Sequence, residues 1–252
     1  MTILASIFFI ATSLAPHQAI EIGVKVWQNE CGGTVEGLTS WNEGEEFASL
    51  GIGHFIWYPS HAQGPFVETF PELIRFFKSN KVEIPRWIEE ARGCPWKNRE
   101  EFQIALHANT KQMIDLRRLL QKNIPLQAQF LQSRLEQALP TLFANISEEK
   151  KNKIKTLYNR ILAHPNGPFV ILDYVNFKGY GTSQNEVYEG LGWGLYQVLD
   201  NMANPSDDDP IVQFVKSAKE ILERRVKHSP PLRHEQRFLK GWINRLDGYI
   251  QN

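Results

Sequence analysis

One tract of the chain cannot form a continuous helix, and it constrains the fold more than any other feature. Residues 29–54, NECGGTVEGLTSWNEGEEFASLGIGH, contain six glycines and five glutamates. A glycine inside a helix costs about 1 kcal/mol relative to alanine, so this density of glycines excludes a continuous helix. Any fold for this chain must therefore place a non-helical, acidic segment between the elements that precede and follow it.

The segment before and at the start of this tract has the pattern of an amphipathic helix. Its apolar residues recur at steps of three or four residues, at Ile20, Val24, Trp27 and Cys31. Gly32 and Gly33 follow directly and predict the end of the helix.

The rest of the tract has the pattern of a β-hairpin. Residues 34–41 alternate in a strand-like way, and residues 47–58 form a second apolar segment that glycines interrupt. Asn42-Glu43-Gly44, between the two segments, is a tight-turn sequence, because glycine accepts the positive φ that such turns need.

Most of the remaining chain is predicted to be helical, from prolines at helix starts, a serine N-cap and apolar periodicity. The predicted helices cover residues 71–79, 85–92, 100–121, 125–139, 147–162, 187–202, 210–225 and 232–250, and residues 168–178 form a helix or a strand. We therefore expect an α+β protein that is predominantly α-helical, with a small N-terminal β-hairpin and a single domain over residues 20–252.

The composition argues against several classes of function. Lysine plus arginine and aspartate plus glutamate each number 28, so the net charge offers no attraction to nucleic acid or to an anionic membrane. The chain has no GxxxxGK[ST], GxGxxG, GxSxG or HExxH motif, so we expect neither a cofactor nor a metal. We also expect a monomer without a stable membrane anchor.

The first nineteen residues, MTILASIFFIATSLAPHQA, predict a secretory signal peptide. The apolar run from Ile3 to Leu14 is too short to span a bilayer, and small residues follow it near Ala15 and Ala19. Cleavage near Ala19 would make the protein periplasmic or secreted. The alternative is a buried or amphipathic segment, because no lysine or arginine precedes the run.

Whether the two cysteines, Cys31 and Cys94, can form a disulfide also depends on whether the protein is exported. An exported protein would allow them to form a disulfide, whereas a cytosolic one would keep two free thiols. Their spacing is not that of a metal site or of a CxxC motif.

Among the glutamates of the tract, Glu30 has the setting of a general acid. It ends the predicted helix, one residue before Cys31 and three after Trp27. Partial burial against apolar surface and the C-terminal end of the helix dipole both disfavour the charged carboxylate. A general acid needs such a protonated carboxyl near neutral pH. The alternative is that Glu30 points into water.

The order of residues in the tract resembles the catalytic region of phage-type lysozymes. In that family a glutamate ends the first helix, an acidic residue lies on the hairpin, and a threonine and a G-[IY]-G-H motif follow. Glu43, five intervening residues, Ser49 and the segment LGIGH ending at His54 match this arrangement. The twelve residues between Glu30 and Glu43 are a longer interval than the family has, and Glu36 in the sequence E-G-L is the competing candidate for the acid.

This resemblance implies a lysozyme-like fold and a cell-wall glycosidase. The expected reaction is cleavage of β-1,4 links between the aminosugars of peptidoglycan, by a muramidase or a lytic transglycosylase. Glu30 would protonate the glycosidic oxygen, Glu43 would act as the second carboxylate, and Ser49 would position water. The alternative is a non-catalytic glycan-binding or envelope scaffold protein that keeps the fold.

The expected substrate-binding residues come from two parts of the chain. The segment DYVNFKG resembles the Y-N-A-G motif of lytic transglycosylases, although its spacing differs. The candidates are Trp41, His54, Tyr58, Tyr174 and Asn176. For Trp41 and Tyr58, packing in the core is the alternative. The whole chain is also similar to a family of secreted bacterial proteins that carry LTSWN and FASLGIGHFIWYP, a resemblance that implies no activity.

Overall fold

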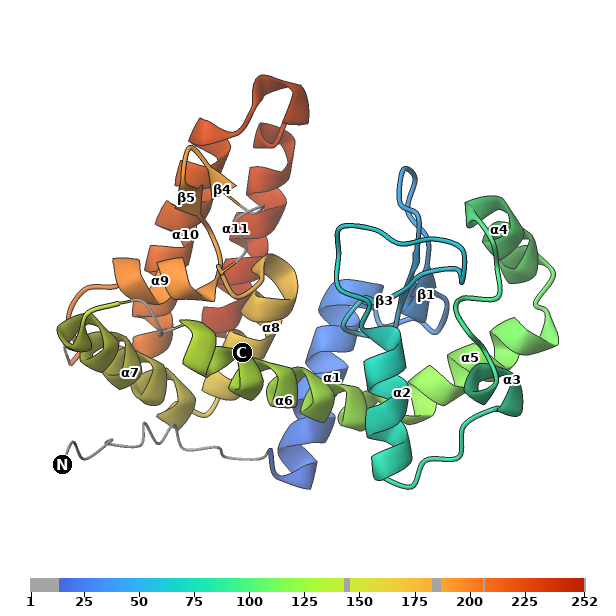
Figure 1. The fold of residues 1–252 in the computed structure, drawn as a ribbon. Coiled ribbons are helices and arrows are strands. Elements are labelled where there is room, and N and C mark those ends of the chain that lie inside the picture. Colours follow the sequence, from blue (N-terminus) through green and yellow to red (C-terminus); the bar gives the residue numbers. More distant parts are fainter. Residues whose placement is uncertain (1–13, 143–145, 183–186, 206, 252) are drawn as a thin grey trace, which may run out of the picture. The chain divides into compact units, whose positions relative to one another are not determined.

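Helices make up 63% of the structure and strands 6%, with the strands in small antiparallel sheets (Figure 1). The computed structural model describes residues 14–142, 146–182, 187–205 and 207–251. The prediction of a predominantly helical chain with a small antiparallel sheet is confirmed. Residues 1–13, most of the predicted signal peptide, lie outside the described residues.

The chain divides into two compact units, each described here by itself. The first comprises Leu14–Leu131 and the second includes Gln132–Asn252. Residues 20–252, for which the sequence predicts a single domain, contain parts of both units.

The first unit combines one small sheet with short helices. Its sheet is antiparallel in the order β1-β2-β3. The elements are α1 (Pro16–Cys31), the 3-10 helix η1 (Glu36–Leu38), β1 (Thr39–Ser40), β2 (Ala48–Leu50), β3 (Phe55–Trp57), α2 (Phe70–Ser79), α3 (Arg86–Glu89), α4 (Arg99–His107), α5 (Lys111–Lys122) and the first part of α6 (Ile124–Leu142).

Helix α1 ends where the sequence predicts, but it buries a different face. Gly32 adopts a left-handed conformation (φ 62°) and its N–H donates to the carbonyl of Trp27, which closes the helix. Ile20 and Val24 are 52% and 38% exposed. The buried residues of the helix are Ala19, Ile22, Gly23, Val26 and Cys31, and a Cβ at Gly23 would lie 2.9 Å from Ile124 Cγ2. The start of α6 thus packs closely against α1 because Gly23 has no side chain.

Two predicted elements of this unit are wrong, and the local backbone conformation shows why. Residues 36–38 form η1 instead of the predicted strand, so Glu36 lies on a 3-10 turn. The predicted helix over residues 100–121 is two helices, because Asn109 has a positive φ (45°) and the hydroxyl of Thr110 caps α5 by accepting from the Met113 N–H.

The turn between β2 and β3, Gly51–His54, is fastened to three other segments. The Gly51 N–H donates to the carbonyl of Leu38 (2.8 Å), and the Cys31 thiol lies 3.8 Å from the Gly51 carbonyl. The Ile52 N–H donates to Oε1 of the fully buried Gln127 (3.0 Å). Gln127 in turn donates to the Leu120 carbonyl (2.7 Å). The end of α1, the sheet and α6 therefore meet at this turn.

The second unit is a helical assembly around α10 with one β-hairpin. Helix α10 packs against α7, α9 and α11, and α10 and α11 lie side by side in Figure 1. The elements are the remainder of α6, α7 (Glu148–Ala163), α8 (Gly167–Lys178), β4 (Val187–Tyr188), β5 (Leu191–Gly192), α9 (Leu195–Asn201), α10 (Pro210–His228), the 3-10 helix η2 (Pro231–Arg233) and α11 (Gln236–Gln251).

One predicted helix in the second unit is wrong at its start. Residues 187–192 form the β4–β5 hairpin, and helix α9 begins only at Leu195. Glu189 and Gly190 both have positive φ (51° and 77°), which makes the tight turn and stops the helix. Residues 168–178, left open between helix and strand, belong to α8.

Two acids that are buried among the described residues of the second unit, Asp173 and Glu235, are paired with arginine. Asp173, which is fully buried, accepts hydrogen bonds from Arg245 Nε and Nη2 (2.8 and 2.7 Å). Glu235 accepts from Arg225 Nε and Nη2 (both 2.7 Å) and from the Tyr188 hydroxyl (2.7 Å). Burial alone would raise the pKa of Glu235, but these hydrogen bonds and the nearby positive charges outweigh it and lower the pKa. These carboxylates serve to join elements of the fold.

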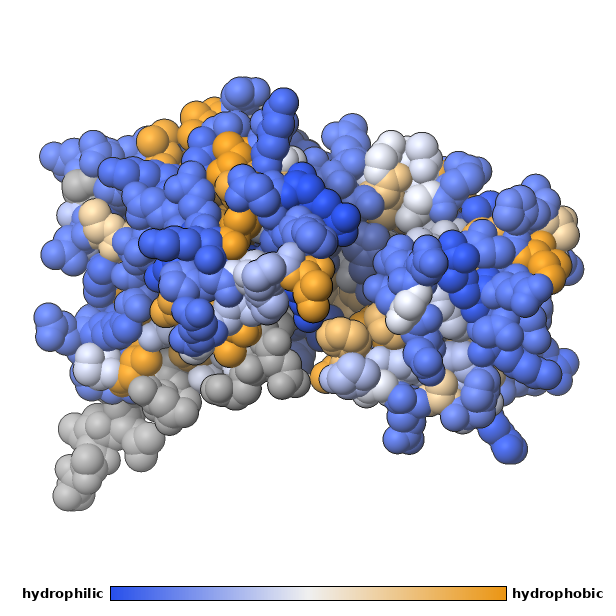
Figure 2. Space-filling model, turned by 90° about the horizontal axis from the view of Figure 1, so that it is seen from above, coloured by the Kyte–Doolittle hydropathy of each residue, from blue (hydrophilic) through white to orange (hydrophobic). Residues whose placement is uncertain are grey.

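The face of the molecule in Figure 2 is mostly hydrophilic, and hydrophobic residues interrupt it in small groups. Single exposed apolar residues are normal on protein surfaces. No helix among the described residues is long and apolar enough to cross a membrane.

Replacing Gly51 should destabilise the protein much more than replacing Gly44. Both glycines have positive φ (70° and 79°), so an alanine at either position carries left-handed strain of about 1–2 kcal/mol. At Gly44 an added Cβ meets nothing, whereas at Gly51 it would overlap Gln127 Oε1 and break the bond to Ile52. Gly51→Ala should therefore lose about 1–3 kcal/mol more than Gly44→Ala. Urea unfolding measures both, and equal losses would contradict the role of Gln127.

Candidate functional site

The last turn of α1 presents a carboxylate that is almost buried. The side chain of Glu30 is only 11% exposed, and its Oε2 lies 3.1 Å from Nε2 of His54. His54 belongs to the β2–β3 turn, has a positive φ (47°) and is 40% exposed in its side chain. The helix end and the turn therefore bring together one carboxyl and one imidazole, with the imidazole on the solvent side.

This pair can hold a proton in either of two arrangements. When Glu30 is ionised, the Nε2–H of His54 donates to the carboxylate. When Glu30 is protonated, its hydroxyl donates to a neutral Nε2. A carboxyl that is held in place and can gain or lose a proton in this way has the properties of a general acid or base. The charge of Glu30 also acts on its neighbour, since burial first and then Glu30 raise the pKa of the Cys31 thiol to about 12.

The sheet beside this pair has one partly exposed face and one face that is buried in the core. Side chains alternate along a strand, and Ser40 pairs with Ser49, which pairs with Ile56, so these three share a face. Ser40 and Ile56 on this face are partly exposed, whereas Ser49 is 5% exposed. On the other face, Leu50 and Phe55 are fully buried in the core.

Glu43 lies on the exposed turn between β1 and β2. Within the described residues its side chain makes no hydrogen bond or ion pair, so no interaction of either kind joins it to Glu30 or to Ser49. The turn is held by Glu45, whose carboxylate accepts from Asn42 Nδ2 (3.1 Å) and whose carbonyl accepts from Trp41 Nε1 (2.7 Å). The competing candidate, Glu36, is exposed on η1.

Three of the five expected substrate-binding residues pack in the core. Trp41 is 4% exposed and lies against Phe102, with ring centroids 5.7 Å apart. Tyr58 is 6% exposed and lies edge-on to Phe47. These positions agree with the core packing that the sequence left open for the aromatic residues.

The other expected contacts fall in the second unit. Tyr174 is fully buried, its hydroxyl donates to the Trp193 carbonyl (2.9 Å), and burial raises its pKa. Asn176 lies on the same helix, α8, and is partly exposed. His54, the remaining expected contact, is the partner of Glu30.

Sequence reasoning missed Gln127, which holds the turn that carries His54. The hydrogen bond from Ile52 to Gln127 spans 75 residues of sequence. The one local signal is a glutamine within the apolar pattern of a predicted helix, and such a glutamine is also common on helix surfaces.

The disulfide considered for Cys31 and Cys94 is not formed. Both cysteines are free and buried. Cys31 faces the Gly51 carbonyl, whereas the backbone of Cys94 is bridged to Pro59 and its N–H donates to the Tyr58 carbonyl (2.8 Å). Burial raises the pKa of each thiol to about 12.

Comparison of the chain with protein-family models, curated proteins and solved structures finds no match. In the part of the chain that the structure describes, no group of three or more histidine, cysteine, aspartate or glutamate side chains is placed to hold a metal ion. The functional assignment therefore depends on the chemistry of Glu30 and His54.

Both thiols should resist alkylation in the folded protein. With each pKa raised to about 12, almost no thiolate exists at pH 8, and burial blocks access to the sulfur. We expect no modification by iodoacetamide under native conditions and two modifications in denaturant without reductant, counted by mass spectrometry. Two modifications that appear in denaturant only after reduction would show a disulfide instead.

Proposed function

We propose that the protein is a glycosidase that cleaves β-1,4 links between the aminosugars of peptidoglycan, with Glu30 as the general acid. The observation that supports this most is the Glu30 carboxyl, which is 11% exposed, ends a helix and is held by His54 at 3.1 Å. Its place before a small antiparallel sheet and the segment Gly51–His54 also agrees with the resemblance to phage-type lysozymes.

In this proposal Glu30 transfers its proton to the glycosidic oxygen as the bond between two sugars breaks. His54 holds the carboxyl in position and supplies a polar partner for both of its protonation states. General acid catalysis of this kind contributes about 10²- to 10⁴-fold to the rate.

The Glu30–His54 pair suffices for a mechanism with one catalytic carboxyl. A hydrolase with two carboxylates needs them within about 5–10 Å on either side of the scissile bond. Glu43 is exposed on a turn, and its side chain makes no hydrogen bond or ion pair with the described residues, which suits either mechanism. A lytic transglycosylase needs only Glu30, which first protonates the leaving oxygen and then accepts the proton of the 6-hydroxyl that attacks the anomeric carbon of the same sugar. The product is a 1,6-anhydro sugar, and no water is consumed.

A non-catalytic glycan-binding protein is the second candidate. The core positions of Trp41 and Tyr58 support it, because they leave fewer aromatic surfaces for a substrate than the sequence predicts. In that case Glu30 and His54 would be a structural pair at the junction of α1 and the sheet.

Glu30→Gln should abolish cleavage of purified peptidoglycan, with a loss of at least about 100-fold, because the amide cannot donate the proton. Glu36→Gln is the matched control, since Glu36 is an exposed glutamate close by in sequence, and it should be fully active. Glu43→Gln should also remain active, with 1,6-anhydro products in the mass spectrum.

Three outcomes separate the candidates. Full activity of Glu30→Gln would remove Glu30 from the mechanism. Reducing ends in place of anhydro ends, together with an inactive Glu43→Gln, would assign a two-carboxylate hydrolase. A wild-type protein that binds peptidoglycan without releasing muropeptides would favour the scaffold.

A further inference from the structure

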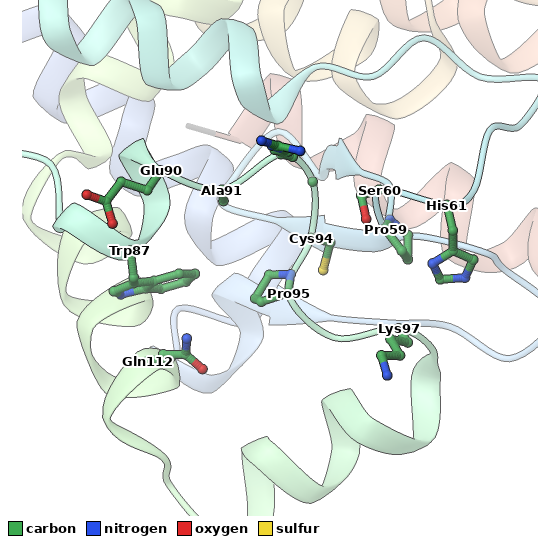
Figure 3. Close-up of a pocket in the computed structure, with 12 residues that line it drawn as sticks. Pro59, Ser60, His61, Trp87, Glu90, Ala91, Cys94, Pro95, Lys97 and Gln112 are labelled. Carbon is green, nitrogen blue, oxygen red and sulfur yellow. The ribbon is translucent and has the colours of Figure 1, made fainter.

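Two adjoining cavities lie in the first unit, in the loops that follow β3 and α3. The larger, about 460 Å³, lies between the start of the β3–α2 loop, the end of α3 and the loop that leads to α4 (Figure 3). The smaller, about 320 Å³, lies on the β3–α2 loop itself. Both are lined by Pro59, Ser60 and Arg92, so the cavities share a wall. Figure 3 shows the Trp87 indole at one end of the larger cavity and the His61 imidazole at the other.

Each cavity is lined by a buried aromatic donor that has no partner. Trp87 lines the larger cavity and Tyr58 lines the smaller one, and the Trp87 Nε1 and the Tyr58 hydroxyl, both buried beside these cavities, form no hydrogen bond with the described residues. Trp87 is held between Trp57 and Trp96, with both ring centroids 6.2 Å away. Buried polar atoms are almost always hydrogen-bonded, because an unsatisfied donor costs about 1–3 kcal/mol. Two such donors beside adjoining cavities need polar partners, which water or a polar ligand can supply.

Around the larger cavity, the charge that has no ion-pair partner among the described residues is positive. Arg92 and Lys97 are exposed, and their side chains make no ion pair with the described residues. The acid that lines the larger cavity, Glu90, is paired with Arg86 (2.7 Å). Glu68 lines the smaller cavity and accepts from the neutral Tyr58 N–H (2.8 Å), so it keeps its negative charge there. The free groups are therefore mainly hydrogen-bond donors with a positive charge, which suits a carboxylate.

The smaller cavity also has a surface for stacking. Phe66 is 55% exposed and is supported edge-on by Phe47, with ring centroids 5.8 Å apart. An exposed, supported aromatic ring is a good platform for the apolar face of a sugar.

We propose that the two cavities form one accessory groove that binds peptide-bearing sugar units of peptidoglycan. Arg92, in the shared wall, binds a carboxylate of the peptide, Trp87 and Tyr58 donate to hydroxyl or N-acetyl oxygens, and Phe66 stacks on a sugar ring. The choice of this polymer rests on the proposed function, whereas the groove and its preference for carboxylate-bearing sugars rest on the residues above. The groove would hold the strand without taking part in its cleavage.

An NMR titration of the full chain tests this groove. The protein has seven tryptophans, so its indole N–H signals are few, and Trp87→Phe identifies the one from Trp87. The probes are a purified peptide-bearing muropeptide and a chitooligosaccharide, which has the same N-acetyl aminosugar without carboxylates. We expect the muropeptide to shift the Trp87 signal and to bind at least about tenfold more tightly than the chitooligosaccharide.

Variants then assign the contacts. Arg92→Gln should weaken muropeptide binding at least about tenfold, and Tyr58→Phe, which removes only the unpaired hydroxyl, about fivefold. Arg118→Gln is the matched control, because Arg118 is an exposed arginine of the same unit that lines neither cavity, and it should bind like the wild type.

The outcomes distinguish this groove from the catalytic proposal. No shift of the Trp87 signal at the solubility limit of the muropeptide, or unchanged binding by Arg92→Gln, would overturn the groove. Equal affinity for the chitooligosaccharide would overturn its preference for carboxylates. A protein that binds through Arg92 but cleaves nothing would refute only the catalytic role of Glu30.

Discussion

The first unit depends on how the β2–β3 turn is fastened to α1 and α6. Gly51 adopts a positive φ and leaves room for Gln127, whose amide satisfies the Ile52 N–H inside the core. The same turn approaches the end of α1 through the Gly51 carbonyl and the Cys31 thiol. A buried N–H without a partner would cost about 1–3 kcal/mol, so the turn has one favourable conformation. That conformation places His54 against Glu30.

The buried carboxylates of the second unit contact arginine, whereas Glu30 in the first unit contacts a histidine. The kind of partner indicates which carboxyl can take part in proton transfer. Asp173 and Glu235 each accept two hydrogen bonds from an arginine and one from a tyrosine, which holds both carboxylates in place. Glu30 is 11% exposed and contacts the imidazole of His54, which can give or take a proton. A carboxyl in the second situation is the better candidate for catalysis.

Turns and helix ends that depend on a glycine were predictable from the sequence, whereas packing between distant segments was not. The end of α1 follows from Gly32, and the turn near Glu43 follows from Gly44, because both need only a positive φ. The break at Asn109 and the hairpin at Glu189 were missed, since a non-glycine residue with positive φ leaves little trace in a pattern of apolar residues. Gln127 was missed because its role requires contact with a turn 75 residues away. The burial of Trp41 and Tyr58 was undecided for the same reason, since an aromatic residue suits both a core and a binding surface.

The central claim is that Glu30 and His54 form one coupled pair at the end of α1. A double-mutant cycle on the free energy of unfolding, with Glu30→Ala, His54→Asn and the double variant, measures this coupling without reference to any substrate. Asparagine is suitable at position 54 because it tolerates the positive φ found there. We predict a coupling energy of about 0.5–1 kcal/mol, as for a partly exposed pair. Effects that add within about 0.3 kcal/mol would show that the two side chains do not interact, and would contradict the site proposed for this protein.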